Sequence, residues 1–165
     1  MDPLNAGSWS QLGEVEFRGG KLDEAETNYK KAHELRPDFF FSSLWLSEIY
    51  VMQGRPQDAL PEIERLGYPG IRMFLYAIAY HALGRKTESD AALRELIAKY
   101  QATYPCLIAE IYAFRNQPDE AFEWLDRAYA SHDDELIYTK VEPLLKSLHN
   151  DPRFAAFLKK LHLPT

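Results

Sequence analysis

The sequence has a single cysteine, Cys106, among its 165 residues. One cysteine excludes an internal disulfide and is typical of a reducing compartment. No apolar run approaches the roughly 20 residues that a membrane-spanning helix needs, and Met1–Asn5 lacks the basic and apolar regions of a signal peptide. We therefore expect a cytoplasmic protein.

Positive charge is also scarce, with 19 Lys and Arg against 25 Asp and Glu and a net charge of −6. No stripe of Lys and Arg stands out, so we expect this segment to bind no nucleic acid. Aromatic residues, by contrast, make up 13% of the chain. They recur at regular intervals, which points to a repeated structure.

The few glycines mark the period of that repeat. Turn residues separated by 34, 30 and 32 positions are Gly20, Gly54, Gly84 and Asn116. Glycine ends a helix in the left-handed conformation without a Cβ penalty, and Asn is its usual substitute. Five positions after each turn stands a small residue that would let two helices approach closely: Ala25, Ala59, Ser89 and Ala121. A fixed period of this length predicts a stack of small helical units.

Each unit carries apolar residues at the i, i+3, i+4, i+7 spacing of amphipathic helices, and no strand is predicted. We predict helices over residues 6–18, 22–36, 39–53, 57–66, 71–83, 87–100, 102–115 and 119–131. Asp23 and Glu26 have the spacing of a capping box, and Pro56 and Pro118 suit a first helical turn. Pro61 predicts a short helix around it.

After Ser131 the period is expected to dissolve. We predict a short helix from Asp134 to Lys140, a turn from Pro143 to Leu148, and a final helix from Pro152 to Leu161 that Asp151 caps. The domain prediction is a repeat array over residues 1–131, with units at about 6–38, 39–69, 70–101 and 102–133. Capping helices over residues 132–165 follow it, because a solenoid must close its core at each end.

The first unit closely resembles the tetratricopeptide repeat through Trp9, Leu12, Gly13, Gly20, Ala25, Tyr29, Ala32 and Pro37. Three looser copies follow. Two departures are Glu16, where the family usually has an aromatic residue, and Ser89, which replaces the small Ala. The resemblance implies an all-α, right-handed superhelical solenoid of about four hairpins with a C-terminal helical cap. It also implies a protein-binding module without catalytic activity or cofactor.

The tail resembles a narrower group. Its residues Lys140–Leu144 and Asn150–Phe154 are similar to the C-terminal end of bacterial multi-domain regulators, in which the repeats follow a winged-helix, kinase or cyclase domain. Asp2–Ala6 looks like the connector that closes a preceding repeat. We therefore expect a sensory or scaffolding segment of a larger bacterial signalling protein. The alternative is a freestanding cytoplasmic adaptor.

In tetratricopeptide arrays the first helix of each hairpin lines the concave groove. Helical spacing assigns to that groove Phe17, Arg18, Phe41, Leu44, Glu48, Met52, Phe74, Ile78, His81, Glu110 and Phe114. We expect about half of them to be solvent-accessible. The set predicts an apolar protein or peptide guest.

Charge adds some basic character to the expected guest. Glu14, Glu48 and Glu110 occupy equivalent places in three units, so they would form a row of carboxylates, although they could equally serve solubility alone. The basic residues of the carboxylate clamp found in co-chaperone repeats are missing. Of Phe39, Phe40 and Phe41, at least one should be exposed to a partner or an adjacent repeat. Homo-oligomerisation through an exposed end repeat is also possible.

No constellation of catalytic or metal-binding residues emerges. The five histidines are scattered, with no His-Glu-x-x-His pattern, so no metal site is predicted. Gly19–Gly20 is a turn and not a phosphate-binding loop, and Cys106 suits a small packing residue better than a nucleophile. A small hydrolase or metal enzyme is left as a remote alternative to a binding module.

Overall fold

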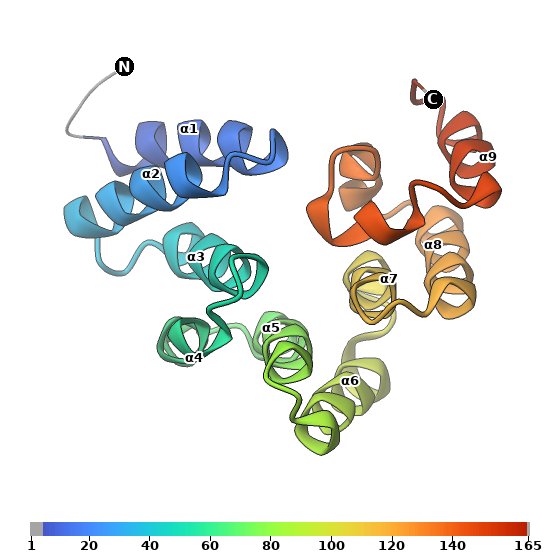
Figure 1. Ribbon diagram of the computed structural model, residues 1–165, viewed down its shortest axis with the longest axis horizontal. Coiled ribbons are helices and arrows are strands. Elements are labelled where there is room, and N and C mark those ends of the chain that lie inside the picture. Colours follow the sequence, from blue (N-terminus) through green and yellow to red (C-terminus); the bar gives the residue numbers. More distant parts are fainter. Residues whose placement is uncertain (1–4, 165) are drawn as a thin grey trace. The chain divides into compact units, whose positions relative to one another are not determined.

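The computed structural model describes residues 5–164, and every regular element within that range is a helix (Figure 1). The chain divides into two compact units, Met1–Ser89 and Asp90–Thr165. The expected connector at Asp2–Ala6 falls largely on residues 1–4, outside the described part of the chain.

Unit 1 consists of stacked helical hairpins. Its helices are α1 (Ala6–Arg18), α2 (Leu22–Leu35), α3 (Phe40–Met52), α4 (Pro56–Arg65), α5 (Pro69–Ala82) and the start of α6 (Lys86–Tyr100). Helices α1 and α2 pack together as one hairpin, and α3 and α4 form the next. Helix α3 also contacts α2 and α5, so each hairpin packs against its neighbour in the sequence.

Unit 2 contains the rest of α6, one complete hairpin and the tail. Its further elements are α7 (Pro105–Phe114), α8 (Pro118–Ser131), the 3-10 helices η1 (Asp134–Tyr138) and η2 (Pro143–Leu148), and α9 (Pro152–Lys160). Helix α7 packs against α8 and, separately, against η2.

The helices lie where the sequence predicts them, with boundaries that differ by up to three residues. The largest difference is at α7, which begins at Pro105 and not at residue 102, because proline fits the first position of a helix. Helix α5 begins at Pro69, two residues before the predicted start at residue 71. Both differences arise because proline starts a helix as readily as it ends one.

The left-handed turns are confirmed. Positive φ angles of 76°, 74°, 71° and 57° occur at Gly20, Gly54, Gly84 and Asn116. The N–H of the residue after each turn donates to the carbonyl five positions earlier: Lys21 to Glu16, Arg55 to Tyr50, Arg85 to Tyr80 and Gln117 to Tyr112, at 2.8–2.9 Å. This bond satisfies a carbonyl that the end of the helix would otherwise leave unpaired.

In two of the turns a side chain reinforces the backbone bond. The Arg55 guanidinium lies 4.6 Å from the centre of the Tyr50 ring, and Arg85 lies 4.5 Å from that of Tyr80. These are cation–π distances. In each of these turns the Tyr and the Arg are therefore joined by a backbone hydrogen bond and by a side-chain contact.

The predicted capping box at Asp23 and Glu26 is wrong. Helix α2 has Lys21 at its N-cap without a side-chain hydrogen bond, so Asp23 lies inside the first turn. Both carboxylates accept hydrogen bonds from the Gln53 amide, at 2.9 and 3.0 Å, and so tie α2 to the end of α3. The first-turn positions of Pro56 and Pro118 are confirmed, and α4, with Pro61 inside it, has only 10 residues.

Where the sequence departs from the repeat pattern, hydrogen bonds replace apolar packing. The Ser89 hydroxyl is fully buried and donates to the Ala77 carbonyl at 2.5 Å, which joins α6 to α5. The Glu16 carboxylate accepts a hydrogen bond from the Asn28 amide, which joins α1 to α2. Each polar substitution is thus matched by a partner on the opposing helix.

The tail keeps the period that was expected to dissolve after Ser131. Three side-chain contacts join residues 34 positions apart: Ser147 to the Ala113 carbonyl at 2.7 Å, Arg153 to Asp119 at 2.7 Å, and Lys160 to Asp126 at 2.8 Å. The tail therefore stacks on the last hairpin in the register of one more repeat. Two 3-10 helices precede α9, where the other repeats have one long helix.

The first hairpin depends on the contact between Gly13 and Tyr29. Tyr29 has no exposed surface, and a Cβ atom at Gly13 would lie 2.9 Å from its ring. A contact this short requires one of the two helices to move. The absence of a side chain at Gly13 thus sets how closely α1 can approach α2.

We expect Gly13→Ala to lower the free energy of unfolding by about 1–2 kcal/mol, measured by urea denaturation. Overpacking costs roughly 1–3 kcal/mol, which exceeds the gain of up to about 1 kcal/mol from removing a glycine from a helix interior. Gly67→Ala is the control: it has ordinary φ and no atom within 4 Å of the new Cβ, so we expect a change below about 0.5 kcal/mol. A Gly13→Ala variant as stable as the wild type would contradict this account of the hairpin.

Candidate functional site

The residues assigned to the groove come from four helices. Phe17 and Arg18 lie on α1; Phe41, Leu44, Glu48 and Met52 on α3; Phe74, Ile78 and His81 on α5; Glu110 and Phe114 on α7. All but the last two belong to unit 1. We therefore describe the surface of unit 1 by itself.

Burial separates the assigned residues into two groups. Buried in the chain are Phe17, Glu48, Phe74, Ile78 and Glu110. Exposed or half-buried are Arg18, Phe41, Leu44, Met52, His81 and Phe114. A partner cannot touch a side chain without accessible surface, so only the second group can offer direct contacts. The expectation that about half would be accessible agrees with this division.

The accessible apolar residues of unit 1 gather on α3. Phe41, Leu44 and Met52 are separated by three and eight positions, so they share one face of that helix. Phe41 is 48% exposed, and the other two are half-buried. We call these three residues the α3 stripe. Glu48, which the same spacing places between Leu44 and Met52, is buried and interrupts the stripe.

Trp45 is the residue next to the stripe that the sequence analysis missed. Its ring centre lies 5.0 Å from that of Phe17 and 6.2 Å from that of Tyr29, and the Arg18 guanidinium lies 5.4 Å from it. Trp45 therefore covers Phe17 and joins α3 to the first hairpin. Its position four residues after Phe41, on the border of the apolar face, was the signal that could have identified it.

Charged groups surround the buried Tyr29 phenol beneath this surface. Burial raises the pKa of Tyr29, and the nearby Glu14 and Glu48 carboxylates raise it further, whereas Arg18 opposes them. Arg18 also donates to the Glu14 carboxylate at 3.2 Å. The phenolic oxygen has no hydrogen-bond partner within the described residues. Tyr29 thus stays protonated throughout the physiological range.

The three carboxylates expected along the groove do not form an exposed row. Glu14 is half-buried and forms an ion pair with Arg18. Glu48 and Glu110 are only 4% and 6% exposed. Burial of a carboxylate requires compensating partners, which removes it from contact with a guest. Helical spacing predicts the equivalent positions of these residues, but it does not reveal their burial.

Aromatic rings cluster where α3 begins. Phe40 lies edge-on to Phe41 at 5.4 Å and to Tyr68 at 4.6 Å, and Phe39 lies 5.6 Å from Phe41. Of the three consecutive phenylalanines, Phe41 is the exposed one, which confirms that they cannot all be buried. Tyr68, at 56% exposure, adds a second accessible ring. The α3 stripe thus begins within an aromatic cluster.

Cys106 in unit 2 is a packing residue. It is 2% exposed, and its Sγ lies 3.8 Å from the Glu110 carboxylate. Burial raises the pKa of the thiol well above its ordinary value, and Glu110 and Asp133 raise it further. The thiolate is the nucleophilic form of cysteine. Cys106 is therefore poorly suited to catalysis.

Within residues 5–164, no group of three or more His, Cys, Asp or Glu side chains is arranged to hold a metal ion. No helix in the same range combines the length and hydrophobicity needed to cross a bilayer.

Comparison with known families agrees with the hairpins and turns described above. Models of the tetratricopeptide repeat match residues 10–70 and 73–103, which together make up more than half of the chain. The chain belongs to the tetratricopeptide repeat family. No curated protein matches the sequence.

Membership of the family confirms the predicted all-α fold of stacked hairpins. Tetratricopeptide repeats are protein–protein interaction modules, and this chain is one by membership. The family is typically a non-catalytic scaffold. Residues beyond 103 lie outside both matches, yet α7, α8 and the tail continue the same turn geometry and the 34-residue contacts.

We expect Cys106 to be unreactive in the folded protein. With iodoacetamide at pH 7.5, labelling followed by mass spectrometry should be at least about tenfold slower than in 6 M guanidinium chloride, because burial both hides the thiol and disfavours its thiolate. The matched control is an added exposed cysteine, Ser131→Cys, which should label at similar rates in both conditions. Fast native labelling of Cys106 would show that α7 opens readily.

Proposed function

We propose that this chain is a non-catalytic binding module whose guest, an extended or helical peptide with apolar side chains, contacts the α3 stripe. The observation that supports this most directly is the exposure of Phe41 in line with Leu44 and Met52 on one helix face. Aromatic residues and Met are enriched among interface anchors. A face of this kind accepts apolar side chains spaced along a peptide.

The residues that flank the stripe add to the proposed contact surface. Arg18 and Trp45 lie next to it on the side of α1, and His81 lies at the end of α5. Arg18 retains some accessible surface and could contact a guest carbonyl or carboxylate. The basic character we propose for the guest depends on Glu14 alone, since the equivalent Glu48 and Glu110 are buried. Phe114, in unit 2, would extend the surface of its own unit.

The context that we propose is a sensory or scaffolding segment of a larger bacterial signalling protein in the cytoplasm. The support is the similarity of the tail, from Lys140 to Leu144 and from Asn150 to Phe154, to the ends of multi-domain regulators. A freestanding adaptor, or one that self-associates through an end repeat, is the alternative. Measuring the mass of the endogenous protein distinguishes them, because a regulator would be heavier than 19.1 kDa.

The binding surface can be tested with a phage library of random 12-residue peptides selected on the immobilised wild-type chain. We expect enriched peptides with apolar residues, whose dissociation constants rise at least about tenfold in Phe41→Ala, equivalent to about 1.4 kcal/mol. Truncation of an aromatic anchor at an interface commonly costs this much. Fluorescence anisotropy with labelled synthetic copies of the peptides would supply the constants.

Val15→Ala is the matched control for this test. Val15 is an apolar residue of α1 that is 70% exposed and lies outside the predicted groove, so its truncation should leave binding unchanged. Circular dichroism would confirm that both variants stay folded. Selected peptides that bind Phe41→Ala as tightly as the wild type would contradict the proposed surface.

A further inference from the structure

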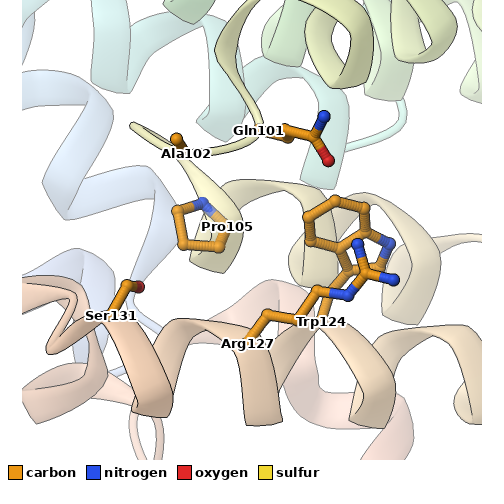
Figure 2. A pocket seen from close by; sticks show the side chains of 6 residues that line it. All are labelled: Gln101, Ala102, Pro105, Trp124, Arg127 and Ser131. Atoms are coloured by element: carbon orange, nitrogen blue, oxygen red, sulfur yellow. The ribbon is translucent and has the colours of Figure 1, made fainter.

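Unit 2 contains a cavity of about 410 Å³ that is open to solvent. Figure 2 shows the six side chains that line it: Gln101, Ala102, Pro105, Trp124, Arg127 and Ser131. The last three lie on α8 at spacings of three and four, so one face of that helix forms a wall. Gln101 and Ala102, from the segment between α6 and α7, and Pro105, the first residue of α7, form the other wall. The volume falls within the range of small-ligand sites, roughly 300–1,000 Å³.

The lining combines apolar surface with a single charge. Trp124 and Pro105 are largely buried in the chain, so each offers the cavity a small apolar surface. Arg127 is the only charged residue among the six, although the whole chain carries a net charge of −6. Its guanidinium lies 4.3 Å from the centre of the Trp124 ring. Arg127 therefore supplies the one cationic group of the lining, next to the Glu123 carboxylate with which it is paired.

The polar side chains around the cavity differ in the hydrogen bonds that they already form within the protein. The Ser131 hydroxyl donates to the Ala128 carbonyl at 3.1 Å. The Gln101 side chain has no hydrogen bond within residues 5–164, so its amide can both donate and accept. Arg127 is paired with Glu123 at 2.5 Å, but both side chains are at least half exposed. An exposed pair at this helical spacing is weak, so a ligand carboxylate can replace Glu123.

We propose that this cavity binds an acidic peptide segment in which an apolar side chain neighbours an Asp or Glu. The apolar side chain lies against Pro105 and Trp124, the carboxylate pairs with Arg127, and the Gln101 amide bonds to the peptide backbone. The fork of the guanidinium matches a carboxylate with two parallel hydrogen bonds. Its stacking on Trp124 holds that fork in place. This site is independent of the one proposed on α3.

The test uses the indole N–H signals of the full chain in ¹H–¹⁵N NMR spectra. The sequence has three tryptophans, Trp9, Trp45 and Trp124, and Trp124→Phe assigns the signal of interest. The probes are the dipeptides N-acetyl-Leu-Glu-amide and N-acetyl-Leu-Gln-amide, which differ only in the charge of the second side chain. N-acetyl-Gly-Glu-amide keeps the charge and lacks the apolar group.

We expect the Leu-Glu probe to shift the Trp124 signal saturably, with the signals of Trp9 and Trp45 unmoved. The Leu-Gln and Gly-Glu probes should each bind at least about fivefold more weakly. Arg127→Gln should reduce the affinity for Leu-Glu to that for Leu-Gln. Arg94→Gln, which removes another exposed arginine of unit 2 from outside the cavity, should leave it unchanged.

Three outcomes would overturn the proposal. The first is no saturable shift of Trp124 with the Leu-Glu probe. The second is equal affinity for the charged and neutral probes, which would mean that Arg127 does not recognise a carboxylate. The third is an equal loss of affinity in Arg127→Gln and Arg94→Gln, which would indicate general attraction of an anion. Loss of peptide binding in Phe41→Ala would bear only on the α3 stripe, so the two sites can fail separately.

Discussion

The reversal of the chain at each left-handed turn is the constraint on which the hairpins depend. A residue with φ between 57° and 76° ends each first helix, and the next N–H closes a hydrogen bond to the carbonyl five positions earlier. The second helix can then lie close to the first only where the side chains between the two helices are small. At Gly13 an added Cβ atom would lie only 2.9 Å from the Tyr29 ring, so this position tolerates no side chain. The surface of α3 available to a partner is what remains after these hairpins have packed.

Much of this arrangement was predictable because the signals are local. Turn glycines, first-turn prolines and the spacing of apolar residues depend on a few neighbouring positions, and they located the helices to within three residues. The capping box failed because α2 begins two residues too early for Asp23 to serve as its cap. The persistence of the repeat into the tail was missed because it lies in contacts between Arg153 and Asp119 and between Lys160 and Asp126, which no local pattern reveals.

The candidate site was less predictable, since helical spacing gives the face of a residue but not what covers it. Phe17 was assigned to the groove by position and is instead covered by Trp45 from the next hairpin. Glu48 lies on the same helix face as Phe41, yet it is buried near the Tyr29 phenol. The cavity beside Trp124 depends on the conformation of the segment between α6 and α7, which no local sequence pattern predicts. Burial and cavities are properties of the assembled fold.

The paired contacts at the turns restrict where the repeats can change length. Tyr50 to Arg55 and Tyr80 to Arg85 are five positions apart, as are Tyr112 and Gln117 at the third such turn, whereas the turns themselves are separated by 34, 30 and 32. An insertion between Tyr and Arg would break the carbonyl bond and the ring contact together. An insertion in the second helix of a hairpin, or in a connector, would leave the hydrogen bond and the ring contact intact. Length variation among related chains should therefore accumulate between hairpins and spare the turns.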